Sequence, residues 1–399
     1  MKNWETKKLG EVCDIVNGFT PLKSNRKFWD DGDIPWFTID DIRKQGRIIE
    51  NAEQKITKTA LGNNNKRLLP AETILLCCTA SVGEYAITKI SLTTNQQFNG
   101  LVIKDKNTLS PMFLFYFSQI LKNKLLKLSG KTTIDFIPIS RLKNIEVSYP
   151  PLSEQHRLVK ILDSSFAKIE QVKSSIEKNL QSTKELFESY SKNIFENKSG
   201  NWEEKRLEEL GTITSSKRIY KKEYVKNGIP FYRIKEIKEL AHDKSATLEL
   251  YISTKRYEEI KNMFGVPQIG DVLMTAVGTI GEIYVVKNNN KFYFKDGNIL
   301  WFKNFDSINP YFLKYVLMSF IRQINKLSQG STYSALTIEK IQKHKVSFPK
   351  SLSEQRKIVS HLDSLSSQTK KLESIYQQKL ADLEELKKSI LAKAFAGEL

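Results

Sequence analysis

The sequence predicts a mixed α+β fold, with two α/β domains separated by two long α-helices that form an antiparallel coiled coil. Three observations predict it: an internal repeat, a part of that repeat with a fixed length, and a helical spacing of apolar residues within that part. The chain has 399 residues, which is more than one hydrophobic core usually supports, so at least two domains are expected.

The repeat consists of five short matches that recur in the same order. The matched residues are 4–9 with 202–207, 34–39 with 229–234, 81–84 with 279–282, 111–114 with 310–313, and 152–155 with 352–355. Chance does not produce five matches in one order. The chain therefore contains two copies of one arrangement.

The number of residues between equivalent positions divides each copy into two parts. It varies from 195 to 199 over the first part, which indicates the insertions and deletions that loops tolerate. From Ser153 and Ser353 onward it stays at 200, as expected of a rigid spacer. We therefore expect a first domain at residues 1–151, a helix at 152–198, a second domain at 199–351 and a helix at 352–399.

Both fixed-length segments have helical periodicity. Ser153 and Ser353 are the expected N-caps, because each precedes a glutamate at the end of the helix where the dipole favours an anion. Residues then recur every three or four positions as Leu158, Leu162, Phe166, Ile169, Val172, Ile176, Leu180, Thr183, Phe187, Tyr190 and Ile194, and as Ile358, Leu362, Leu365, Thr369, Leu372, Tyr376, Leu380, Leu383, Leu386, Ile390 and Ala394. The other helix is the nearest partner for each stripe, and packing of each helix on its own domain is the alternative. The order of the parts makes the pair antiparallel, so the chain termini should approach each other.

The first part of each copy combines strand-like and helical segments. Residues 72–76 with 85–87, and 271–274 with 283–286, resemble hairpins. Ser110-Pro111 and Asn309-Pro310 match the N-cap and first position of a helix. Each domain is therefore expected to be a mixed α/β globule.

The composition favours an anionic partner and an intracellular setting. Lys and Arg number 63 against 45 Asp and Glu, a net charge of +18 that favours nucleic acid, although a basic chain can also reflect its source genome. Cys13, Cys77 and Cys78 form neither a disulfide framework nor a spaced metal-ligand set, which favours a reducing cytoplasm. No apolar run is long enough to span a bilayer and the N-terminus lacks the apolar core of a signal peptide, so we expect no membrane association.

The sequence suggests no active site. Asn309-Pro310-Tyr311 resembles part of an amino-methyltransferase motif, but the second proline and an upstream glycine-rich cofactor loop are missing. A helix cap explains the same residues. The four histidines lack the spacing of metal ligands, and no phosphate-binding loop pattern occurs. We expect a non-catalytic chain with no cofactor or metal of its own.

Four motifs in combination resemble a known family. The first is an opening tryptophan, Trp4 or Trp202, with a basic residue and a leucine a few residues later, and the second is the Ile-Pro pair at 34–35 and 229–230. The third is Pro-Leu-Ser-Glu-Gln at 151–155, and the fourth is Ala-Phe-Ala-Gly-Glu-Leu at 394–399. In the second copy the proline of the third motif is displaced to Pro349. Over its whole length the chain resembles the specificity subunit of Type I restriction-modification systems.

The resemblance implies a non-catalytic subunit with two target recognition domains. Each would read one half of a bipartite, asymmetric target in double-stranded DNA. The helices would dock two copies of a modification subunit, which methylates adenine with S-adenosylmethionine. A restriction subunit, a motor and nuclease that uses ATP and Mg²⁺, can join such a complex.

Candidate DNA contacts follow from the chemistry of recognition, in which cations meet phosphates and polar side chains meet base edges. Each copy offers a cationic loop, a polar or charged pair at a strand end, and a polar glycine loop. In the first copy these supply Lys23, Ser24, Arg26, Lys27, Thr38, Asp40, Lys131, Thr132 and Thr133. In the second they supply Lys217, Arg218, Tyr220, Lys221, Arg233, Lys235, Ser331, Thr332 and Tyr333. The alternative is that these are ordinary solvated side chains.

Two other functions remain open at this point. One is a stand-alone DNA-binding regulator, and the other is a coiled-coil scaffold whose basic charge is incidental. The closing motif at 394–399 and the paired Leu-Ser-Glu-Gln segments favour the subunit. Co-purification with a methyltransferase subunit would discriminate between these functions.

Overall fold

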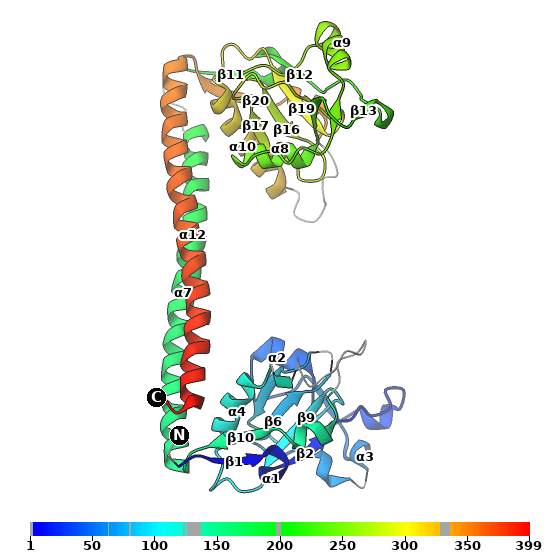
Figure 1. Ribbon diagram of the computed structural model, residues 1–399, viewed down its shortest axis with the longest axis vertical. Coiled ribbons are helices and arrows are strands. Elements are labelled where there is room, and N and C mark those ends of the chain that lie inside the picture. Colours follow the sequence, from blue (N-terminus) through cyan, green and yellow to red (C-terminus); the bar gives the residue numbers. More distant parts are fainter. Residues whose placement is uncertain are drawn as a thin grey trace. The chain divides into compact units, whose positions relative to one another are not determined.

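The computed structural model describes residues 3–62, 64–79, 81–122, 124–125, 137–196, 201–327 and 336–399. The chain forms two compact units, Met1–Glu177 with Gln378–Leu399 and Lys178–Gln377, here called the N-terminal unit and the C-terminal unit. Each contains one domain and a part of both long helices, α7 (Leu152–Glu196) and α12 (Leu352–Ala396) (Figure 1).

The domain of the N-terminal unit is built from short strands and helices. They are β1 (Glu5–Lys8), α1 (Leu9–Val12), β2 (Cys13–Asn17), β3 (Ile34–Phe37), α2 (Ile39–Gln45), β4 (Ile48–Ile49), β5 (Gln54–Ile56), α3 (Lys58–Leu61), β6 (Ile74–Cys77), β7 (Tyr85–Thr88), β8 (Thr93–Thr94), β9 (Phe98–Ile103), α4 (Pro111–Ile120), α6 (Ile139–Lys143) and β10 (Glu146–Tyr149). One sheet has the order β2-β9-β6-β7-β4, another has the order β5-β3-β8, and β1 pairs with β10.

The domain of the C-terminal unit repeats most of this topology, but its described residues contain no counterpart of β4 and have β13 as an additional strand. Its elements are β11 (Trp202–Arg206), β12 (Thr212–Thr214), β13 (Tyr224–Val225), β14 (Ile229–Tyr232), α8 (Ile234–Ala241), β15 (Tyr251–Ile252), α9 (Thr254–Phe264), β16 (Val272–Thr275), β17 (Ile283–Val285), β18 (Tyr293–Phe294), β19 (Ile299–Lys303), α10 (Pro310–Leu327), α11 (Ile338–Gln342) and β20 (Lys345–Pro349). The sheet orders are β12-β19-β16-β17, β13-β15-β14-β18 and β11-β20. The predicted mixed fold with two repeated domains is confirmed.

The short repeated motifs lie at defined turns. The predicted hairpins are confirmed, because β6 pairs antiparallel with β7 and β16 pairs antiparallel with β17. Gly83 and Gly281, in the turns that join these strands, have φ values of 84° and 91°, a region that favours glycine. Ser110 precedes Pro111 at the start of α4, and the Asn309 side chain accepts hydrogen bonds from the first turn of α10, as the sequence predicts.

The caps of the long helices lie two residues earlier than predicted. Gln155 N donates to Pro151 O and Gln355 N donates to Ser351 O, so Pro151 and Ser351 occupy the cap positions. The predictions that Ser153 caps the first long helix and that Ser353 caps the second are therefore wrong. A proline serves at this boundary because the residue that precedes a helix needs no backbone N–H of its own.

Parts of both long helices pack together within each unit. In the N-terminal unit, Leu158 and Phe166 of α7 share an apolar cluster with Leu391 and Ala394 of α12. Lys173 pairs with Glu384 at 3.1 Å, and Glu170 pairs with Lys387 at 3.1 Å. In the C-terminal unit, the remaining parts of α7 and α12 pack around one apolar core. It includes Phe187, Ile194 and Phe195 of α7 and Ile358, Val359 and Leu362 of α12. The partners run in opposite directions, which confirms the antiparallel pair.

Four residues of the predicted apolar stripes are exposed to solvent and are not buried between the two long helices. They are Val172 and Tyr190 in α7, and Leu372 and Leu386 in α12. The apolar stripe of each helix is wider than the strip that a single neighbouring helix covers, so its edges remain in solvent. These positions are a correction to the predicted seam.

The opening tryptophans and the helix ends meet in each domain core. In the N-terminal unit, the Phe113 ring lies 6.2 Å from the Trp4 ring and 5.0 Å from the Phe395 ring. In the C-terminal unit, Phe312 contacts Trp202 and Phe195 in the same way. The two ends of the chain therefore approach each other in the N-terminal unit, as predicted (Figure 1).

Candidate nucleic-acid interface

The cationic loop of the N-terminal unit is a well-supported turn. Its side chains Lys23, Ser24, Arg26 and Lys27 are exposed. Asn25 caps a short 3-10 helix at 26–28, accepting a hydrogen bond from Lys27 N at 3.2 Å. None of its three cations forms an ion pair with another described residue. The loop therefore presents three positive charges without an ion pair, on a backbone that the Asn25 hydrogen bond fixes.

The equivalent loop of the C-terminal unit is partly compensated. Lys217, Arg218, Tyr220 and Lys221 are exposed there. Arg218 pairs with Asp296 at 2.7 Å, whereas no ion pair of Lys217 or Lys221 is found among the described residues. The Lys217 ammonium lies 5.0 Å from the centre of the Phe264 ring. This loop therefore offers two uncompensated lysines beside an exposed tyrosine.

The strand-end pairs lie at the start of two short helices that the sequence analysis did not predict. Thr38 precedes α2, and Asp40 in its first turn pairs with Arg43 at 2.8 Å. Thr38 N donates to the buried Asp41 carboxylate at 2.8 Å. An acid three residues after the cap satisfies a free backbone donor, so the Thr-x-x-Asp pattern was the signal that could have revealed this helix.

Arg233 and Lys235 are engaged by carboxylates. Arg233 precedes α8, and its Nη2 lies 2.7 Å from both Glu236, which is buried, and Glu249, which is exposed. Glu249 also accepts a hydrogen bond from Lys235 Nζ. The hydrogen bonds from Lys235 and then Arg233 lower the pKa of Glu249 to about 2. Glu249 was missed by the sequence analysis because it is remote in sequence from the cations that it binds.

In each unit, one short segment connects the chain beside the cationic loop to the chain beside the helix start. It is residues 94–95 in the N-terminal unit and 295–296 in the C-terminal unit. Thr94 O accepts from Phe19 N, and Asn95 N donates to Phe37 O, which directly precedes Thr38. In the C-terminal unit, Lys295 N donates to Tyr232 O, and the neighbouring Asp296 binds Arg218. Two of the three predicted clusters in each copy therefore lie on either side of a shared segment. The third clusters, Lys131, Thr132, Thr133, Ser331, Thr332 and Tyr333, lie outside the described residues.

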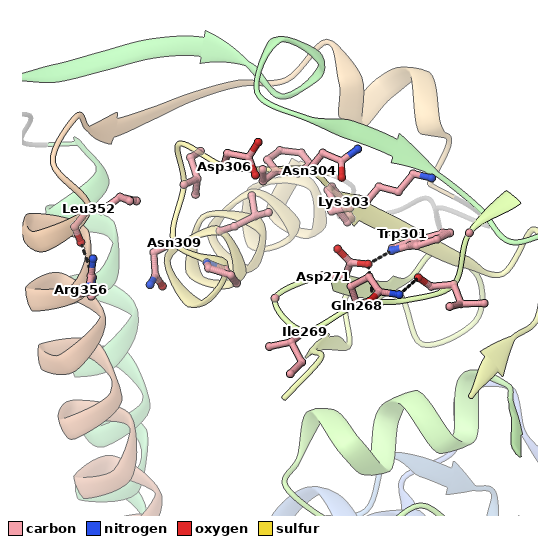
Figure 2. Close-up of a pocket in the computed structure, with 18 of the residues that line it drawn as sticks. Gln268, Ile269, Asp271, Trp301, Lys303, Asn304, Asp306, Asn309, Leu352 and Arg356 are labelled. Carbon is pink, nitrogen blue, oxygen red and sulfur yellow. Dashed lines mark hydrogen bonds between the residues drawn. The ribbon is translucent and has the colours of Figure 1, made fainter. Parts of the chain in front are cut away.

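A cavity of about 760 Å³ lies in the C-terminal unit (Figure 2). Asp271 on its wall accepts hydrogen bonds from Trp301 Nε1 at 2.7 Å and from Gln268 N at 2.8 Å. Burial raises the pKa of Asp271. No Ser, Cys or His is among the described residues of the wall, so they do not form a Ser–His or Cys–His pair there.

The three cysteines are free and buried, and burial raises the pKa of Cys13 to about 12 and that of Cys78 to about 11. No group of side chains suited to a metal ion occurs among the described residues. In that same part, no helix combines the length and apolar character needed to cross a membrane.

Comparisons with known proteins agree with this architecture. A family model described as the Type I restriction modification DNA specificity domain matches residues 1–181 and 199–384. The Type I restriction enzyme MjaIX specificity subunit of Methanocaldococcus jannaschii is 30% identical over 59% of this chain and 58% of that relative. The chain thus spans little more than half of this relative's length.

A second relative and a solved structure match nearly the whole chain. The putative specificity subunit S.HindORF215P of Haemophilus influenzae is 27% identical over 92% of this chain and 88% of that protein. A chain solved in a study of complex assembly and conformational transition of the type I R-M system has a TM-score of 0.79, covering 100% of this chain and 99% of its own length at 20% identity. None of these matches supports the regulator or scaffold alternatives. Because the family model matches both copies, the chain belongs to the Type I restriction modification DNA specificity family.

Proposed function

We propose that this chain is the DNA-reading subunit of a Type I restriction-modification enzyme, with each domain recognising one half of a bipartite target in double-stranded DNA. The observation that carries the proposal is the duplication of one domain with an exposed cationic loop at an equivalent place in each copy. Such loops supply the phosphate contacts on which DNA affinity depends. The paired helices would then fix the gap between the half-sites.

The two half-sites differ in sequence under this proposal. Thr38 and Asp40 occupy the start of α2, whereas Arg233 and Lys235 occupy the equivalent start of α8. A carboxylate accepts hydrogen bonds from bases, and cations donate them, so the two positions suit different base edges.

The direct test is a binding selection from random duplex DNA, using the intact chain with any subunits that co-purify with it. We expect two short conserved blocks separated by a gap of constant length. A single contiguous block, or no enriched sequence, would contradict the proposal.

Partner subunits are proposed to dock on the helices. Val172 and Leu386 in the N-terminal unit, and Leu186, Leu372 and Ile375 in the C-terminal unit, are exposed apolar side chains on α7 or α12. Such side chains gathered on helices are typical of protein interfaces. Two modification subunits would cover them and supply adenine methylation with S-adenosylmethionine, and a restriction subunit would bring ATP and Mg²⁺. The site of action would be the cytoplasm.

The chemistry is proposed to reside entirely in those partners. The purified chain alone should therefore transfer no methyl group from labelled S-adenosylmethionine to DNA, and should not cleave DNA. The complex reconstituted with its modification subunit is the positive control. Methyl transfer by the chain alone would overturn the assignment as a non-catalytic subunit.

A further inference from the structure

A buried glutamine holds the start of each long helix against its domain. Gln355, in the repeated Leu-Ser-Glu-Gln motif, is fully buried in the first turn of α12. Its Oε1 accepts a hydrogen bond from Asn309 N at 2.7 Å, and its Nε2 donates to Ser307 O at 3.1 Å and to Pro349 O at 2.8 Å. One amide thus connects the end of β20, the loop before α10 and the helix.

The same connection occurs in the N-terminal unit. Gln155 is also fully buried, and it accepts from Ser110 N at 2.8 Å and donates to Thr108 O and Pro150 O. Burial without these bonds would leave polar groups unsatisfied, which is unfavourable in a protein interior. The repeated motif therefore encodes a repeated joint between a domain and a helix.

A second polar bond crosses the joint farther along the helix. Tyr315 of α10 donates its hydroxyl hydrogen to Asp363 of α12 at 2.5 Å. Burial, and then the bond to Asp363, raise the pKa of Tyr315, which keeps the hydroxyl protonated as a donor. Residues 355 and 363 are eight positions apart, or about 12 Å along a helix. Two fixed points at that separation define the direction of α12 relative to the domain.

Apolar packing of Val359 and Leu362 against the domain fills only part of this joint. The cavity of about 760 Å³ is bordered by Asn309 on the domain and by Leu352 and Arg356 in the first turns of α12 (Figure 2). A second cavity of about 430 Å³ lies between α10 and the stretch of α12 from Asp363 to Lys370. Hydrogen bonds are directional, whereas apolar contacts tolerate tilting. The polar bonds are therefore the directional contacts of the joint, beside the apolar packing of Val359 and Leu362.

We propose that Gln355 and the Tyr315–Asp363 pair are positioning residues that restrict the length of the gap accepted between the two half-sites. This inference rests on the proposed function, because it presupposes a bipartite DNA target. A helix of 45 residues is about 67 Å long at 1.5 Å per residue. A tilt of about 3° at one end moves the other by about 3.4 Å, the rise of one base pair.

The test is a selection for gap length at constant half-sites. The intact chain with its co-purifying subunits is offered duplexes in which the selected half-sites are separated by gaps up to about three base pairs shorter or longer than the wild-type optimum. Gln355→Met removes the polar joint at nearly constant volume, and Tyr315→Phe and Asp363→Ala each remove the second bond. Gln378→Met is the matched control, because Gln378 lies on the same helix with an exposed hydrogen bond to Asp382. Asp363→Asn retains an acceptor for Tyr315.

We expect the variants Gln355→Met, Tyr315→Phe and Asp363→Ala to accept gaps at least one base pair longer or shorter than those that the wild type accepts. The half-site sequences should be unchanged. The Gln378→Met and Asp363→Asn variants should keep the wild-type gap distribution. A folded Gln355→Met, Tyr315→Phe or Asp363→Ala protein that keeps a distribution as narrow as wild type would show that the joint only stabilises the fold. Should Gln355→Met fail to fold, the other two variants decide. If the wild type selects no bipartite sequence, the proposed function itself fails, which is a separate result.

Discussion

Exposed cations on the two domains differ in whether a carboxylate already neutralises them. Lys23, Arg26 and Lys27 have no ion pair with a described residue, whereas Arg233 and Lys235 share Glu249. A DNA phosphate can approach the first group without displacing an internal partner. The second group must exchange one anion for another, so its net contribution to affinity is smaller.

Replacing Lys23, Arg26 and Lys27 together with alanine should weaken binding to every DNA sequence. The slope of log K against log salt should become shallower by up to about 2.7, since each phosphate contact contributes about 0.9. Fluorescence anisotropy over a range of salt concentrations measures this. The variant K23R/R26K/K27R keeps three cations and should keep the slope. An unchanged slope in the alanine variant would remove this loop from the interface.

The substitution Glu249→Gln should tighten DNA binding at low salt. It removes the carboxylate charge from Lys235, whereas Arg233 keeps its ion pair with the buried Glu236, so the salt slope should steepen by up to about 0.9 as one cation becomes available. Glu258→Gln is the matched control, because Glu258 also pairs with two lysines, Lys261 and Lys291. If both variants tighten binding equally, net charge explains the effect and the start of α8 is not part of the interface.

Elements with strong periodic or turn signals could be predicted from the sequence. The two helices of 45 residues and the hairpins around Gly83 and Gly281 are examples. Helices α2 and α8 were missed because seven or eight residues carry too few apolar repeats to show a helical period. Exposed edges of the long stripes, such as Val172, were assigned to the seam because periodicity does not show how wide a partner is.

The candidate interface was predictable only in part, for a related reason. Charge and loop position indicate Arg218 and Lys217 equally, yet only Arg218 pairs with Asp296, a residue 78 positions away. Pairings over such separations depend on the tertiary fold. The same applies to Gln355, whose role depends on three backbone groups that the fold brings to it.

Lengthening both long helices should lengthen the preferred gap between half-sites. Four residues inserted after Lys178 and four after Gln378 add about 6 Å to each helix and rotate it about 40° beyond a full turn. The preferred gap should grow by about one or two base pairs, given a rise of about 3.4 Å each. Selection on duplexes with variable gaps gives the readout, and both half-site sequences should stay as they were. Retention of the original gap would show that the helices do not set the spacing.

The molecule as a whole is a duplication in which each copy has its own core. The largest core of the N-terminal unit is built on α4 and that of the C-terminal unit on α10, and none of the described residues belongs to both. Separate cores allow one domain to change without repacking the other. Under the proposed function, sequence variation in one copy should therefore alter one half of the target alone.

Exchanging residues 211–340 for the matching stretch of a related subunit tests this independence. One half of the recognised sequence should change and the other half should remain. The reciprocal exchange in the first domain is the control, and it should alter the opposite half. A change in both halves after either exchange would mean that the two domains do not read DNA separately.

The meeting of Trp4 and Phe395 on Phe113 has a consequence for how the chain matures during synthesis. Phe113 leaves the ribosome 282 residues before Phe395, a delay of roughly 15 to 60 s at 5–20 residues per second. During that interval the first domain lacks the helix end that covers it, while its strands are already present. The N-terminal unit is therefore finished last, although its chain is made first. Nascent copies pass through a period in which the side of Phe113 that Phe395 covers is open to chaperones and to the wrong partners.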